Sequence, residues 1–238
     1  MPGIKIRSLR EKVKRKVLKH TVTSKVTMLV PGSILKSILL YICLLSVAQA
    51  SDSNSEMQDG KHFPHKVFFE YNHEPLDLSL TGLTTRTKYF LDIYSIAHYL
   101  QNQPSSTVLK VSDENIYKNI LQNSSTKQIS MVFLRALSAE QIQTSLRSGI
   151  KLNITKTEFH KIQSQVEQFM HAIYADVKKN DEFTIRWLPD GTVISLFQGK
   201  QISQIKNKVF AKTLWAIWFG KFSVVDRKSL IKELLISS

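Results

Sequence analysis

Alternating apolar and polar residues predict strands through the first half of the chain. Lys66–Tyr71 and residues 76–80 alternate as half-buried strands do, and residues 128–134 form a short apolar run between polar neighbours. Residues 88–100 are rich in aromatic and branched side chains and lack a helix cap, so a long strand is expected there. The Thr-Gly pair at residues 81–82 is typical of a turn.

Helix signals begin at residue 138. Ser138 and Gln141 form a capping box, as do Thr155 and Glu158, and apolar residues follow each box at helical spacing. An almost wholly apolar run at residues 210–219 predicts a buried helix.

The remaining signals complete the order of elements. The sequence Pro-Asp-Gly at residues 189–191 predicts a β-hairpin between strands at 183–187 and 192–197. Ser223 is expected to cap a last amphipathic helix that ends at Leu235. Strands, then helices, then a hairpin, then helices predict an α+β fold, with an antiparallel sheet and helices packed on one face.

The first fifty residues have the parts of a secretory signal peptide. A basic segment is followed by an apolar run at residues 37–47 and by Ala-Gln-Ala at 48–50. The run is about half as long as a transmembrane helix. We therefore expect residues 1–50 to be a basic leader and signal peptide cut after Ala50, and the protein to be exported to the periplasm or secreted. Met28 offers a tidier start of translation, and a signal that is not cut would leave the domain tethered.

The net charge of +14 is concentrated in this leader. Residues 1–50 hold ten Lys and Arg residues and a single acid, Glu11, so only +5 remains for the mature chain. That value is ordinary for a folded domain, and we expect no nucleic-acid partner and no membrane span in the mature chain. Residues 51–65 are polar without an apolar period and are expected to be a flexible lead-in, which leaves 66–238 for the domain.

Few residues indicate a reaction centre. The sequence has no glycine-rich phosphate loop, no G-x-S-x-G and no close histidine pair. Cys43 is the only cysteine and lies in the apolar run, so the mature chain is expected to lack disulfides, a thiol nucleophile and thiolate metal ligands. His62, His65 and His73 lie in or near the polar lead-in and are interpreted as solvated, and His98 is interpreted as a core histidine. We therefore expect neither a metal nor a cofactor.

Three segments resemble chalcone isomerase-like proteins. TGLTTRTKYFLDIYSIAHYL at residues 81–100 is similar to their strand motif, in which a glycine precedes an arginine and an aromatic strand. MVFLRALSAEQIQTSLRSGI at 131–150 resembles the strand and helix that follow, and residues 189–235 resemble the closing hairpin and helices. The resemblance spans residues 76–235 and points to the bacterial exported branch of the family.

This resemblance implies an open-faced β-sandwich with an apolar cleft between the sheet and the helices. Plant enzymes of the family close a chalcone into a flavanone, whereas related non-catalytic members hold fatty acids, with an arginine and a tyrosine at the carboxylate. Arg86 is the implied ligand-binding cation, and a surface cation beside Lys88 is the alternative interpretation. Tyr94 falls where the plant enzymes have a strand threonine, so it either donates its hydroxyl to a ligand or fills the core. No counterpart of the plant tyrosine and asparagine is found, and the catalytic residues stay unknown.

Three functions remain open at this point. The first is an exported domain that binds a small apolar or amphipathic anion, such as a fatty acid, and does not cyclise chalcones. The second is an isomerase (intramolecular lyase) that acts on an enone or phenolic substrate. The third is a structural or partner-binding domain whose cleft is filled by side chains. A continuous apolar cavity that Arg86 reaches would distinguish the first two from the third.

Overall fold

Consecutive strands pair with one another to form the main sheet of the structure, a computed structural model in which residues 55–101 and 112–236 are described. In this part of the chain the sheet has seven strands in the order β3-β4-β5-β6-β7-β8-β9, and every pair is antiparallel. The α+β fold with an antiparallel sheet is confirmed. The strands are β3 (Lys66–Tyr71), β4 (Glu74–Lys88), β5 (Leu91–Leu100), β6 (Lys127–Phe133), β7 (Glu182–Trp187), β8 (Thr192–Phe197) and β9 (Lys200–Lys206).

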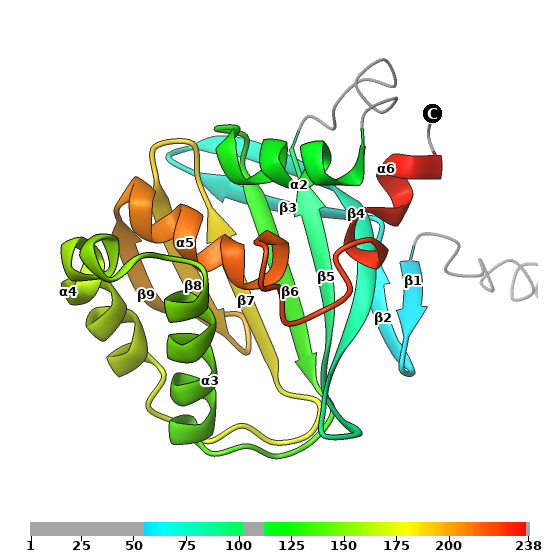
Figure 1. The fold of residues 1–238 in the computed structure, drawn as a ribbon. Helices are drawn as coiled ribbons and strands as arrows, with labels where there is room; N and C mark the ends of the chain where they lie inside the picture. Colours follow the sequence, from blue (N-terminus) through cyan, green and yellow to red (C-terminus); the bar gives the residue numbers. More distant parts are fainter. Residues whose placement is uncertain (1–54, 102–111, 237–238) are drawn as a thin grey trace, which may run out of the picture. The chain divides into compact units, whose positions relative to one another are not determined.

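Helices cover one face of this sheet (Figure 1). Two of the connections between strands, β5–β6 and β6–β7, hold helices, and the remaining helices follow β9 at the end of the described residues. Both capping boxes are present at the starts of α3 and α4, as expected from the sequence. The helices are α2 (Asp113–Gln122), α3 (Ala139–Leu152), α4 (Lys156–Ala172), α5 (Lys208–Phe219), the 3-10 turn η1 (Ser229–Ile231) and α6 (Lys232–Ile236).

The main core lies between the sheet and α5. Nine of the twelve α5 residues are buried, and Trp215 and Trp218 are fully inaccessible, which explains why this helix is apolar over most of its surface. A smaller cluster on the other face joins Leu78, Tyr99 and Phe63. None of the helices in the described ranges combines the length and the apolar character that a membrane crossing needs.

The turn expected at residues 81–82 is wrong. Strand β4 continues through Gly82, and the chain reverses at Tyr89 and Phe90, whose φ angles are 50° and 63°. Gly82 is needed for close packing: a Cβ there would lie 2.1 Å from the Ser229 carbonyl oxygen. Two aromatic residues in a turn that favours Asn-Gly give no sequence signal for a reversal.

The flexible lead-in expected at residues 51–65 is also wrong in its described part. Strands β1 (Ser55–Gln58) and β2 (Lys61–Pro64) form a hairpin that turns at Asp59 and Gly60. Phe63 is only 2% exposed, because the hairpin packs on the sheet face that the helices leave uncovered. The segment expected to be a leader and signal peptide, with Met28, lies outside the described residues.

Three further elements differ from the sequence prediction. Helix α2 and strand β9 were not predicted, because the first begins without a side-chain cap at Ser112 and the second is a half-exposed edge strand with little alternation. The last helix does not begin at Ser223, whose hydroxyl donates to the carbonyl of Trp218 inside a turn. Asp226, in the turn before η1, instead accepts from the Lys228 amide and from the Ser229 hydroxyl.

Candidate functional site

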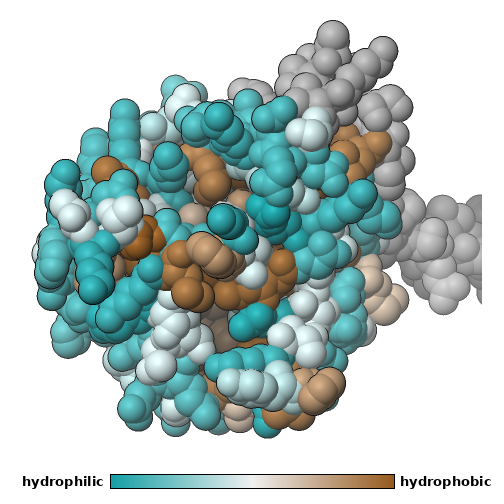
Figure 2. Space-filling view, viewed as in Figure 1, coloured by the Kyte–Doolittle hydropathy of each residue, from teal (hydrophilic) through white to brown (hydrophobic). Residues whose placement is uncertain are grey.

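A cavity of about 660 Å³ lies between the sheet and α3. One wall comes from β4, β5, β6 and β7, and the facing wall comes from the first two turns of α3. Figure 2 shows apolar side chains gathered around the middle of this face, beside α3. The volume of the cavity lies within the range of small-molecule sites in proteins.

The inner end of the cavity is apolar. Met131 and Phe133 of β6, Phe183 of β7 and Ile217 of α5 line it, and each is at most 5% exposed. Ile142 adds an apolar side chain from α3. Since no charged residue lies among these five, this end suits a hydrocarbon chain or ring better than a polar group.

Arg86 and Tyr94 face one another on the sheet wall. They are register partners in the β4–β5 pair, beside a bulge at Arg86 and Thr87, and both line the cavity. The Arg86 guanidinium is half-buried and donates to the carbonyl of Val224, in the loop that follows α5. The structure thus brings the two residues singled out from the sequence into one wall, with the guanidinium held by a backbone carbonyl.

The hydroxyl of Tyr94 is set up as a hydrogen-bond donor. Its oxygen accepts from the Trp218 indole N–H at 3.1 Å, which leaves its own proton for another acceptor. Burial raises the pKa of Tyr94, and the opposing effects of the Trp218 hydrogen bond and the Arg86 charge are smaller. The phenol therefore stays protonated at neutral pH, and a ligand between it and Arg86 meets a neutral donor and a cation together.

The mouth of the cavity has more positive than negative charge. Lys88 and Arg135 line it along with Arg86, whereas Glu140, in the first turn of α3, is the acidic residue among the lining groups of the described chain. An anionic head group at the mouth is therefore favoured over a cationic one.

The model of the chalcone isomerase-like family matches residues 57–235, three quarters of the sequence. The chain belongs to the chalcone isomerase-like family. Among solved structures, the fatty-acid binding protein AtFAP1 of Arabidopsis thaliana is similar at 13% identity and a TM-score of 0.63. The similarity covers 77% of this chain and 97% of that chain, and it shows the shared fold. No curated protein sequence matches the chain.

The sheet wall of this chalcone isomerase-like protein is held from its other face by the β1–β2 hairpin. The Asp59 carboxylate accepts from the hydroxyls of Thr85 and Ser95, the neighbours of Arg86 and Tyr94 along the two strands. Burial alone would raise the pKa of Asp59, but the hydrogen bonds it accepts outweigh burial and leave that pKa lowered. Asp59 is thus a positioning residue that the sequence analysis missed, although its Asp-Gly pair is typical of a hairpin turn.

His98 is a core histidine, as interpreted from the sequence. Trp215 Nε1 donates to its Nε2 at 3.4 Å, so the ring proton lies on Nδ1 and points to the Thr81 hydroxyl at 2.7 Å. Thr81 in turn donates to the Leu230 carbonyl. Burial lowers the pKa of His98 to about 3, and the positive charge of Lys127 adds to the effect. The ring is therefore neutral and structural, and it does not line the cavity.

His62, His65 and His73 do not form a metal site in the structure. In residues 55–101 and 112–236, no three His, Cys, Asp or Glu side chains lie close enough to hold an ion. His62 contacts the Ser55 hydroxyl at 3.3 Å, and His73 is exposed beside Glu70.

Lys127 is fully buried in the same region as His98. Its Nζ donates to the carbonyls of Asn123 at 2.8 Å and Ser125 at 3.0 Å and lies 3.9 Å from the centre of the Trp187 ring. Burial lowers the pKa of Lys127 to about 7, compared with 10.5 in an unfolded chain. Because Lys127 does not line the cavity, this shift concerns stability and not ligand binding.

Stability is expected to rise with pH because of Lys127. Below pH 7 both states hold the proton, and folding carries the full cost of burying a charge. Between pH 7 and 10.5 the unfolded chain binds more protons than the folded one, so the free energy of unfolding increases by at most about 1.4 kcal/mol per pH unit.

Urea unfolding at pH 7 and pH 9 tests this for the wild type and for Lys127→Met. The variant leaves two carbonyls without their donor at either pH, and its free energy of unfolding should lack the increase between pH 7 and pH 9 that Lys127 gives the wild type. Equal pH dependence in the two proteins would show that Lys127 keeps its ordinary pKa.

Proposed function

We propose that this protein binds a fatty acid, or a similar single-chain carboxylate, in the cavity between the sheet and α3, and that it does not cyclise chalcones. The observation that carries the proposal is the combination of an apolar inner end with Arg86 and Tyr94 on one wall. A hydrocarbon chain would pack against Met131, Phe133 and Ile217. Its carboxylate would lie between the guanidinium and the phenol.

The chemistry of the wall matches a carboxylate. A guanidinium offers several N–H groups in one plane, and only one of those of Arg86 is used by the Val224 carbonyl. A protonated Tyr94 adds a donor without adding charge. The fold shared with AtFAP1, a protein described as fatty-acid binding, supports the same class of ligand.

Isomerisation of an enone or phenolic substrate is the second candidate. The observation in its favour is the same Tyr94 hydroxyl, because a donor beside a cation could stabilise a developing enolate. Against it, the described residues that line the cavity include no histidine, and the one carboxylate among them, Glu140, lies exposed at the mouth. The third function, a filled cleft, is not favoured by a cavity of about 660 Å³.

We further propose that the protein is exported and works in the periplasm or outside the cell. The basic start, the short apolar run and Ala48-Gln49-Ala50 support a cleaved signal. N-terminal sequencing of the protein recovered outside the cytoplasm should find Ser51 as the first residue. Recovery of the full chain in the cytoplasm would overturn the proposal.

Native mass spectrometry of the purified full-length protein tests the ligand. We expect a stoichiometric adduct that organic extraction identifies as a fatty acid. An empty protein that also fails to bind added palmitate would overturn the proposal. Conversion of a chalcone to a flavanone at a rate above background would establish the isomerase instead.

A further inference from the structure

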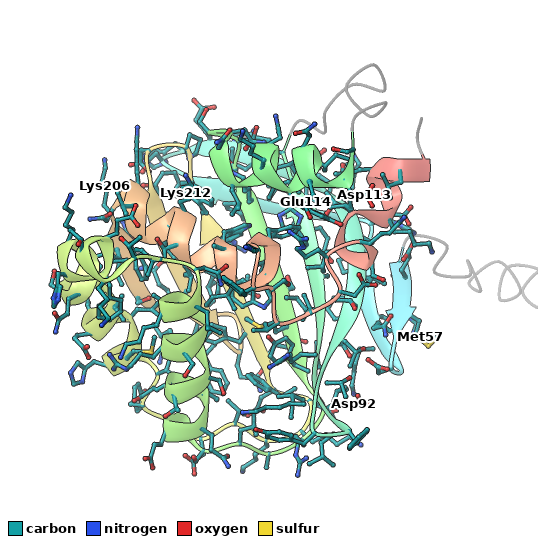
Figure 3. All side chains as sticks on the ribbon, viewed as in Figure 1. Met57, Asp92, Asp113, Glu114, Lys206 and Lys212 are labelled. Carbon is teal, nitrogen blue, oxygen red and sulfur yellow. The ribbon has the colours of Figure 1, made fainter. Side chains whose placement is uncertain are left out.

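The turn between β4 and β5 exposes aromatic side chains at the mouth of the cavity. Tyr89 is 82% exposed and Phe90 is fully exposed, and Leu91, which follows them, is 50% exposed. Tyr89 and Leu91 also line the cavity. In Figure 3 the labelled Asp92 marks this end of the sheet, far from Asp113 and Glu114 on α2, and apolar spheres lie at the same edge in Figure 2.

The backbone of this turn is strained. Tyr89 and Phe90 both have positive φ, a region that glycine and asparagine adopt readily and aromatic residues rarely do. Neither ring is buried, so packing of the two side chains does not offset the energetic cost of the strained backbone. Large apolar side chains kept in strained, solvent-exposed positions indicate a surface that functions when something covers it.

We propose that this turn inserts Tyr89 and Phe90 into the interface of an anionic lipid bilayer and so docks the cavity mouth on the membrane. The docked protein would exchange its fatty acid directly with the bilayer. The exchange step rests on the proposed function, whereas the docking step does not.

The composition of the turn favours a lipid interface. Tyrosine and phenylalanine on a loop tip partition into the head-group region, where a ring is partly buried and a phenol stays wet. Lys88 lies directly before them, with its Nζ 5.3 Å from the Tyr89 ring centre, and Arg135 lies at the same mouth. Asp92 opposes these cations, but its carboxylate accepts from the Thr87 hydroxyl within the hairpin.

A second copy of the chain is a less suitable partner. Two aromatic side chains bury about 300–500 Å² together, which is well below the roughly 800 Å² per partner of a stable protein interface. A bilayer needs no matching surface, because the rings can be surrounded by lipid. The contact also opens the apolar cavity toward the phase where free fatty acid is most concentrated.

Flotation with vesicles tests the docking in the full-length protein. The vesicles are phosphatidylcholine alone and a three-to-one mixture with phosphatidylglycerol. The test variant is Phe90→Gly, because glycine adopts a φ of 63° without strain and Phe90 does not line the cavity. The matched control is Phe68→Thr, which removes a phenylalanine that is 70% exposed on β3, opposite Asp77 and roughly 36 Å along β4 from Lys88.

We expect Phe90→Gly to lower the partition onto the mixed vesicles about tenfold and Phe68→Thr to leave it unchanged. Hydrogen exchange should slow in residues 86–94 when vesicles are added, which separates this contact from any binding by the basic residues 1–50. Equal partition of wild type and Phe90→Gly would overturn the docking. So would a concentration-dependent dimer that Phe90→Gly abolishes, because a second copy would then cover the turn.

Fatty-acid affinity, measured with dissolved palmitate in the absence of vesicles, separates the two proposals. Wild type and Phe90→Gly should bind equally in solution, while transfer of palmitate from vesicles slows in the variant. Palmitate binding without vesicle docking leaves only the proposed function standing. Docking without palmitate binding leaves only the membrane contact.

Discussion

Replacement of Arg86 by glutamine is expected to weaken the binding of palmitate by about a hundredfold, because a buried carboxylate would lose its charge-assisted hydrogen bonds. The apolar inner end of the cavity, with Met131, Phe133 and Ile217, is untouched by the change. The hydrocarbon contribution to affinity should therefore remain. Fluorescence displacement with palmitate and with the alcohol of equal chain length measures the two contributions separately.

The comparison of acid with alcohol distinguishes a direct contact from a structural role. Wild type should prefer the acid, and Arg86→Gln should bind the two about equally. Loss of the Val224 carbonyl contact alone would weaken both ligands to the same extent. That outcome would remove Arg86 from the ligand site.

Arg135→Gln is the matched control for charge. Arg135 lines the same cavity mouth but does not pair with Tyr94 in the sheet, so its loss should weaken palmitate binding only a few-fold through the general field. If Arg135→Gln costs as much as Arg86→Gln, the cavity attracts anions by its overall potential and holds no specific carboxylate site. Arg86→Lys should recover part of the affinity, since it keeps the charge but loses the planar donor set.

The order of the elements could be predicted from local signals. In each capping box the serine or threonine hydroxyl oxygen accepts a hydrogen bond from the backbone amide three residues later, and no distant residue is needed for that contact. The Pro-Asp-Gly hairpin has the same property, with Asp190 accepting from the Thr192 amide. The hydrogen bonds of such motifs can therefore be predicted from the sequence alone.

The elements that were missed depend on distant parts of the chain. The β1–β2 hairpin is mostly polar in sequence, and its position depends on Phe63, which is buried against the sheet, and on Asp59, which accepts hydrogen bonds from residues some thirty positions later. In the sequence, the pair that Gly82 forms with Thr81 is typical of a turn. Only the close contact between Gly82 and the Ser229 carbonyl oxygen shows why a glycine is needed inside a strand. Local sequence patterns depend only on residues that are close along the chain, so they do not predict contacts between distant residues.

For the same reason, only part of the site could be predicted from the sequence. Arg86 and Tyr94 were singled out through the family resemblance, and the β4–β5 register brings them together. Phe183 and Ile217, which help form the apolar end, looked like ordinary core residues. Whether an apolar side chain lines a cavity or fills a core depends on how far α3 stands from the sheet, and no local pattern records that distance.

Gly82 allows the 3-10 turn η1 to lie directly against strand β4. The 3-10 turn η1 lies on β4 at this point, and a Cβ on residue 82 would meet Ser229 O at 2.1 Å and Leu230 C at 2.7 Å. These are backbone atoms, so a change of rotamer cannot relieve the overlap. Moving η1 away would break the 2.8 Å hydrogen bond from Thr81 to the Leu230 carbonyl and expose Ile231, which is fully buried.

Gly82→Ala is therefore expected to lower the free energy of unfolding by about 3 kcal/mol or more, and the melting temperature by about 10 °C. Gly199→Ala is the matched control. Its φ of 73° strains an alanine, but no atom lies within 4 Å of the added carbon, so it should cost only about 1 kcal/mol. Thermal and urea unfolding of the two variants measure the difference. Equal stability would mean that η1 is not held against β4, and the contacts of Leu230 and Ile231 would then contribute little to the stability of the fold.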